Sequence, residues 1–95
     1  MDYLHYKVSV RQGEVIRVTL DEKTDTSQAN IRLLDTLNYF KYSVGKKYAE
    51  TAGGSKQSPL RLTPPYKGQW HVVVDLGRGG GSLKARVDVV PGGSH

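Results

Sequence analysis

Two histidines and an aspartate are the residues whose types could support catalysis or bind a metal. His71 and Asp75 lie four residues apart in one alternating stretch, and His5 lies in another. Imidazole and carboxylate groups bind zinc and other transition metals, but residues four apart on a strand are separated by about 13 Å. His5 or a loop group would therefore have to replace one of the other two. We favour cross-strand polar pairing on an exposed sheet face. We predict no catalytic residue, no metal and no cofactor, with a small metal-assisted enzyme using these three residues as the alternative.

A run of polar residues follows the chain through a predicted junction between a strand and a helix. Asp35 could pair with Arg32 or cap the helix, because Asx side chains commonly accept the free backbone N–H groups of a first turn. A hydrogen-bonded junction and a small-ligand site are both compatible with this pattern. The residues expected to bind a ligand are Asn30, Arg32, Asp35, Asn38 and Tyr42.

The net charge of +5 is concentrated between residues 36 and 68, where Glu50 is the one acidic residue. The basic residues of this segment are Lys41, Lys46, Lys47, Lys56, Arg61 and Lys67. Interleaved tyrosines and cations suit single-stranded nucleic acid, because rings stack on bases and cations meet phosphates. We favour the alternative that the tyrosines are half-buried at sheet edges while the lysines keep those edges from pairing. No nucleic-acid motif accompanies the segment.

Period-two alternation dominates the end of the chain. Residues 70–76 and 83–90 each place apolar side chains on one face, and we interpret them as a hairpin joined by the glycine-rich turn at 77–82. Its apolar face is expected in the core, and its other face, with His71 and Asp75, toward water.

Other stretches predict the remaining strands. Residues 3–10 and 14–20 alternate in the same way and are interpreted as a second hairpin with a short loop. Further short strands are expected at 30–35, 46–50 and 60–62, with loops at 21–28 and 53–55. The residues predicted to share one core are Ile16, Val18, Ile31, Leu33, Leu60, Leu62, Trp70, Val72, Val74, Leu83, Ala85 and Val87.

Residues 36–45 change to a helical period. Leu37, Phe40 and Val44 fall on one helical face, and Gly45 can end the helix in the left-handed region. We expect Tyr39, Lys41 and Tyr42 on the outer side, so that the apolar face packs inward.

These elements predict an all-β protein, an antiparallel β-sandwich or flattened barrel of six or seven strands with one short helix. The 95 residues suffice for one domain. We place it at residues 1–91 and interpret residues 92–95 as a tag-derived or disordered tail.

One set of residues resembles a known family: His5-Tyr6, Asn30–Asp35, Asn38, Tyr42, Gly45, Gly53-Gly54, Ser58-Pro59, Pro65, Gly68, Trp70 and Val72–Gly77. Over nearly its whole length the chain is similar to a small bacterial family catalogued as domain of unknown function 1883. The resemblance implies a stand-alone β-domain, joined in some members to signalling domains, and thus sensing or partner binding. It supplies no catalytic residues. The acidic loop at 21–28 is longer than we expect for the family.

The chain contains no cysteine, which excludes disulfides and thiolate metal sites and fits a cytoplasmic location. We expect no signal peptide and no membrane association. The predicted function is a non-catalytic binding or sensing module, monomeric or homodimeric, for a protein or small-molecule partner. A single-stranded nucleic-acid binder is a further alternative.

Overall fold

The structure, a computed structural model, describes residues 3–20, 30–55, 59–75 and 84–92. The described elements are β1 (Tyr3–Val10), β2 (Glu14–Leu20), β3 (Asn30–Leu34), α1 (Thr36–Ser43), β4 (Ala52–Ser55), β5 (Leu60–Leu62), β6 (Gly68–Asp75) and β7 (Ala85–Pro91). Several sequence interpretations fall outside the described residues: the loop at 21–28, Lys56, the turn at 77–82, Leu83 and the last three residues of the expected tail.

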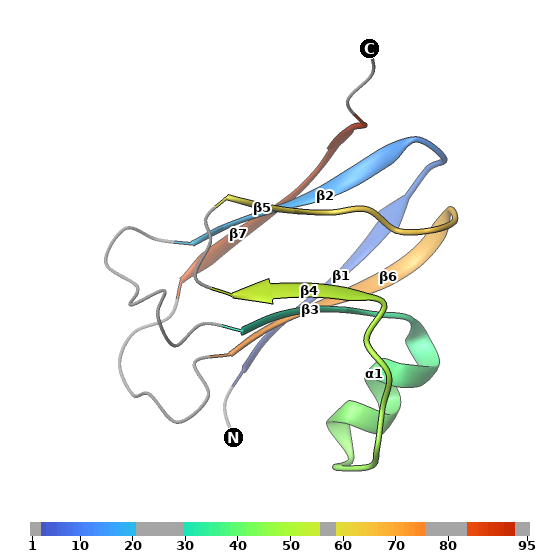
Figure 1. Cartoon of the computed structure of the whole chain (residues 1–95), viewed down its shortest axis with the longest axis vertical. Coiled ribbons are helices and arrows are strands. Elements are labelled where there is room, and N and C mark those ends of the chain that lie inside the picture. The colour runs from blue at the N-terminus through green and yellow to red at the C-terminus, as the bar shows by residue number, and fades with distance from the viewer. Residues whose placement is uncertain (1–2, 21–29, 56–58, 76–83, 93–95) are drawn as a thin grey trace.

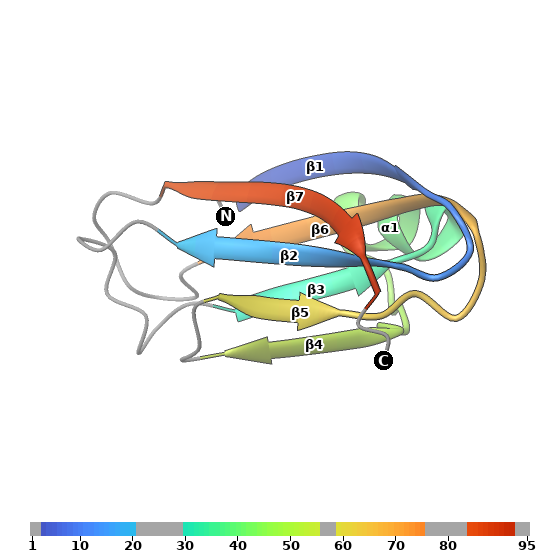
Figure 2. The same cartoon turned by 90° about the horizontal axis from the view of Figure 1, so that it is seen from above.

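The strands form two antiparallel sheets, one with the order β1-β6-β3-β4 and the other with the order β5-β2-β7. Figure 1 shows the smaller sheet, the larger sheet and then α1, which lies on the far side of the larger sheet. Figure 2 looks onto the smaller sheet with the larger sheet behind it, and the strands of both sheets run in the same general direction. Because neither sheet closes on itself, the predicted all-β fold is confirmed in its sandwich form.

The core lies between the two sheets and contains the residues that alternation predicted to be inside. Trp70, Val72 and Val74 on β6 are fully buried, as are Ile16 and Val18 on β2. The other members of the buried cluster are Val10, Leu20, Ile31, Leu33, Leu60 and Leu62, with Ala85 and Val87 partly buried against them. The predicted core is therefore confirmed for the described residues.

Both predicted hairpins are wrong, because each divides its two strands between the sheets. β6 pairs with β1 and β3, whereas β7 pairs with β2. β1 and β2 also lie in different sheets. Alternation shows which face of a strand is buried, and strands that face one core from opposite sheets alternate in the same way as paired strands. The alternation thus predicted which side chains are buried, but not which strands pair with each other.

The segment around Tyr48 is not a strand, and the predicted glycine loop at 53–55 lies within β4. β4 pairs with β3, which places Gly53 opposite Arg32. A Cβ atom at Gly53 would lie 2.7 Å from the carbonyl oxygen of Ile31 and 2.7 Å from a carboxylate oxygen of Glu50. Glycine is therefore required for this close pairing, rather than marking a loop.

The helix begins and ends where the sequence predicted. The Asp35 side chain accepts a hydrogen bond from the Asn38 backbone N–H at 2.8 Å, which makes Asp35 the N-cap. Gly45 has a φ of +78°, in the left-handed region that favours glycine. Its N–H donates to the Tyr42 carbonyl, and the Lys46 N–H donates to the Lys41 carbonyl. These two bonds form a Schellman motif.

The orientation of the helix is the reverse of the prediction. Leu37, Phe40 and Val44 are 61%, 56% and 51% exposed. The tyrosines expected on the outside, Tyr39 and Tyr42, instead contact side chains of the sheet. The sheet face under α1 is polar and aromatic, so tyrosine rings and hydroxyls fit it better than an apolar ridge.

Replacing Phe40 with serine should change the free energy of unfolding by no more than about 0.5 kcal/mol, because the side chain is more than half exposed. Chemical denaturation of both proteins measures this. If the variant loses more than about 2 kcal/mol, as expected for a core phenylalanine, then the helix packs with its apolar face inward.

Candidate functional site

The outward face of the larger sheet carries the polar residues that the sequence singled out. The strand register places Tyr3, Asp75 and Asn30 in one row. The next row holds His5, Val73 and Arg32, and the third holds Lys7, His71 and Leu34. Side chains in one row, or diagonally placed in adjacent rows, come within reach of one another.

This face is covered rather than turned toward water, so the expected exposure of His71 and Asp75 is wrong. His71 is 5% and Asp75 1% exposed. The covering elements are α1 and the segment that follows it. Thr36 contacts the ring of His71 at 3.2 Å, and Tyr42 reaches Asp75 at 3.3 Å.

Asp75 is the centre of a buried hydrogen-bond network. One carboxylate oxygen accepts from the amide of Asn30 at 3.3 Å. The other accepts from Nη1 of Arg32 and from the hydroxyl of Tyr42. A buried carboxylate requires such donors and a countercharge. Asn30, Arg32 and Tyr42, three of the five predicted ligand-binding residues, are thus brought together around Asp75.

Electrostatics favour the charged form of the Arg32 guanidinium. Burial acts to lower the pKa of Arg32, but the neighbouring Asp75 carboxylate outweighs it and the net pKa is raised. Burial and the Asp75 charge also raise the pKa of Tyr42 to about 12. At neutral pH Arg32 is therefore a guanidinium and Tyr42 a neutral phenol.

Aromatic rings lie on one side of the ion pair, with Tyr42 nearest to Arg32. The guanidinium carbon of Arg32 lies 5.7 Å from the centroid of the Tyr42 ring, within the range of a cation–π interaction. The Tyr42 ring meets Tyr48 edge-on at 5.0 Å and Tyr3 at 5.1 Å. These contacts hold the ring of Tyr42 at a set angle beside the guanidinium.

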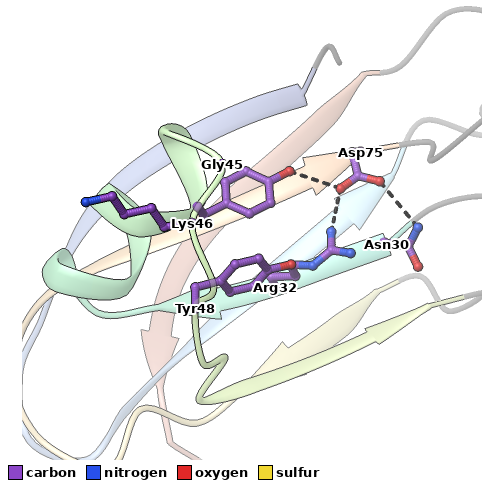
Figure 3. A pocket seen from close by; sticks show the side chains of 7 residues that line it. Asn30, Arg32, Gly45, Lys46, Tyr48 and Asp75 are labelled. Carbon is purple, nitrogen blue, oxygen red and sulfur yellow. Dashed lines mark hydrogen bonds and ion pairs between the residues drawn. The ribbon is translucent and has the colours of Figure 1, made fainter.

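A pocket with a volume of about 300 Å³ opens over this network (Figure 3). Its lining residues are Asn30, Arg32, Tyr42, Gly45, Lys46, Tyr48 and Asp75. Figure 3 shows Arg32 and Asn30 reaching toward Asp75, whereas the Lys46 side chain extends away from Asp75. The guanidinium of Arg32 is therefore the positive charge directed toward this network.

The other two predicted ligand-binding residues, Asp35 and Asn38, do not line the pocket. They hold in place the helix and the segment after it, which form the pocket wall. Asp35 caps α1 and also accepts from the Asn38 amide at 3.0 Å. The amide oxygen of Asn38 in turn accepts from the Ala49 N–H at 2.9 Å, which anchors the segment carrying Tyr48. The sequence prediction missed Gly45 and Tyr48 as lining residues, and it included Lys46 only as a member of the basic patch. The signal for Tyr48 was its position as an aromatic residue three residues after the helix-ending Gly45.

A second cluster surrounds His71 and uses both of its ring nitrogens. Nδ1 lies 2.8 Å from Nε2 of His5, and Nε2 contacts the Thr36 hydroxyl. The ring of Tyr39 stacks on both imidazoles, with centroids 3.9 Å from His5 and 4.7 Å from His71. Burial lowers the pKa of His5 and of His71, and Lys7 lowers both further.

The residues of the metal-assisted alternative are divided between these two clusters. Asp75 belongs to the Arg32 network, and the two histidines bond to each other. Among the described residues no three His, Cys, Asp or Glu side chains are grouped so that they could hold a metal ion.

The histidine pair predicts a loss of stability in acid. Neutral rings can share one proton across the 2.8 Å contact, whereas two imidazolium rings both donate and repel each other. Because the folded-state pKa values lie below the usual 6.5, the unfolded chain binds more protons as the pH falls. The stability that the neutral histidine pair contributes is complete above about pH 6.5, and it is lost as the pH falls through the pKa values of the folded state. Thermal unfolding from pH 7 to pH 5 should show it, and His5→Gln should flatten the curve. An unchanged slope in that variant would show that the pair does not titrate as a unit.

The described basic residues of segment 36–68 do not form one face. Arg61 is exposed on β5 in the smaller sheet. Lys41 lies in α1, with Lys46 and Lys47 just after it, beyond the larger sheet, and Lys67 lies in the turn before β6. A continuous track for a nucleic-acid backbone needs cations on one surface, so this arrangement gives that alternative no support.

Comparison with known proteins identifies one family. Neither a curated protein nor a solved structure matches the chain. No helix among the described residues is long and apolar enough to cross a membrane. The family described as Domain of unknown function (DUF1883) matches residues 1–92 of the 95. The chain therefore belongs to the DUF1883 family.

Proposed function

We propose that this domain is a non-catalytic binding module whose ligand occupies the pocket over Arg32 and Asp75. The observation that carries the proposal is the unequal exposure of the ion pair. The Arg32 side chain is 22% exposed and the Asp75 side chain 1%. The carboxylate thus serves to hold the arginine, and the guanidinium is the group that a ligand can reach.

The hydrogen bonds that Asp75 and His71 already make favour a binding function over a catalytic one. A general base needs a free acceptor within reach of its substrate. Asp75 already accepts from three side chains, and both ring nitrogens of His71 have partners. A substrate would have to displace these bonds before either residue could act.

The size of the pocket favours a small molecule over a protein partner. A volume of about 300 Å³ is at the lower end of the range, about 300–1,000 Å³, that small-molecule sites occupy. We further propose a cytoplasmic location, which the absence of cysteine supports.

A fragment screen followed by heteronuclear NMR tests the proposed site. Small fragments should shift the Arg32 Nε–H signal and the backbone amides of Gly45, Lys46 and Tyr48, which line the pocket. The Arg17 Nε–H signal is the matched control, because Arg17 pairs with Asp88 on the smaller sheet. Hits that gather around Arg17, or around no single place, would contradict the proposal.

A further inference from the structure

Resting on the proposed pocket, we infer the class of its ligand: a small planar molecule that bears one carboxylate, which binds to Arg32. This class follows from the charge of the protein group that is accessible from the pocket. The Asp75 carboxylate is buried and the guanidinium reaches the pocket. A cationic ligand would meet the guanidinium before it could reach any carboxylate of the network.

The guanidinium has donors left for such a ligand. It carries five N–H groups in a planar fork. Nη1 donates to Asp75, and Nε and Nη2 have no partner among the described residues. Asp75 is also the one described carboxylate that forms an ion pair with Arg32. A ligand carboxylate can therefore accept from the free edge, in the bidentate geometry that arginine favours.

Charge balance favours one negative charge over two. Asp75 already neutralises Arg32, and the Lys46 side chain extends away from this network (Figure 3). A dianionic phosphate would bring a second negative charge, and Lys46, the other cationic residue that lines the pocket, extends away from the network. A monocarboxylate brings a single negative charge, and its two oxygens can accept hydrogen bonds from Nε and Nη2 of Arg32.

The aromatic walls favour a flat ligand. Tyr42 and Tyr48 both line the pocket, with their rings edge to face. A planar group beside these rings gains dispersion and quadrupole contacts that a branched aliphatic group of the same volume does not. The carboxylate would then lie toward Arg32 and the planar part toward Tyr48.

Titration with three compounds that share a benzene ring and carry an anionic, a neutral or a cationic substituent tests the class. The probes are benzoate, benzamide and benzylammonium, with inorganic phosphate as a second anion, followed by NMR at Arg32 and Tyr48. We expect benzoate to bind in the millimolar range, as its size allows, and benzamide, benzylammonium and phosphate to bind at least about tenfold more weakly. Arg32→Lys keeps the charge beside Asp75 but removes the fork, and should weaken benzoate about tenfold. Arg17→Lys on the other sheet should leave it unchanged.

A variant that does not depend on the ion pair keeps the test decisive if Arg32→Lys fails to fold. Tyr48→Leu should weaken benzoate about three- to tenfold. If benzamide or benzylammonium binds the pocket as well as benzoate does, the anionic class is wrong and the proposed pocket stands. If phosphate binds as tightly, the restriction to a single carboxylate is wrong. If fragments shift no pocket signal at all, the pocket itself is wrong.

Discussion

Replacing Trp70 with alanine is expected to lower the free energy of unfolding by about 3–5 kcal/mol. Trp70 is fully buried in the centre of the sandwich, and its indole N–H donates to the Tyr66 carbonyl at 3.0 Å. The substitution leaves a cavity between two sheets that cannot easily close, and it orphans a backbone acceptor. A domain of this size holds about 5–15 kcal/mol in total, so the variant should be marginally folded.

Equilibrium denaturation in urea measures the loss, with Tyr66→Ala as the control. Tyr66 contacts the Trp70 ring at a centroid distance of 4.8 Å but is 58% exposed, so its loss should be much smaller. A midpoint for Trp70→Ala that matches the wild type would show that the core does not lie between these sheets.

Replacing Arg32 with methionine should cost about 3 kcal/mol, since it leaves the buried Asp75 charge without its cation. We expect the lower end of the range of about 3–5 kcal/mol for a broken buried pair, because Arg32 is partly exposed and Asn30 and Tyr42 still donate to Asp75. Removing both charges, as Arg32→Met with Asp75→Leu, should recover most of the loss. A double-mutant cycle in urea separates the pair from its parts.

The molecule supplies a matched control for this cycle. Arg17 and Asp88 form a second cross-strand pair, 3.3 Å apart on the smaller sheet, with side chains 36% and 33% exposed. Arg17→Met should cost no more than about 1 kcal/mol, as is usual for an exposed pair. Equal losses at Arg32 and Arg17 would mean that water reaches Asp75 and that α1 does not close over it.

The fold class and the core could be predicted from the sequence because both depend on local periodicity. Alternation around Trp70 and Ile16 shows which side chains point inward, and the cap residues Asp35 and Gly45 delimit the helix through bonds within a few residues of them. Strand partners could not be predicted in this way. The pairing of β6 with β1 places Tyr3 opposite Asp75. These residues are far apart in the sequence, and no pattern near either of them indicates that they pair.

The candidate site was predicted in part for the same reason. Asn30 and Arg32 are two apart on one strand, so a shared face follows from sequence. Asp75 comes beside them only through the register of β6 on β3. The inward position of Tyr42 was missed, because helical periodicity ranks apolar side chains as the buried ones. Here the sheet face under α1 is polar, and Tyr42 packs against it because its side chain has both an aromatic ring and a hydroxyl group.

A crystal structure of the protein grown with benzoate would show whether Arg32 binds a carboxylate in this pocket. We expect density for the carboxylate within hydrogen-bond distance of Nε and Nη2 of Arg32, with the ring beside Tyr48 and the Arg32–Asp75 pair intact. Benzoate bound on the smaller sheet, or an Arg32 side chain turned away from Asp75 into solvent, would contradict this expectation.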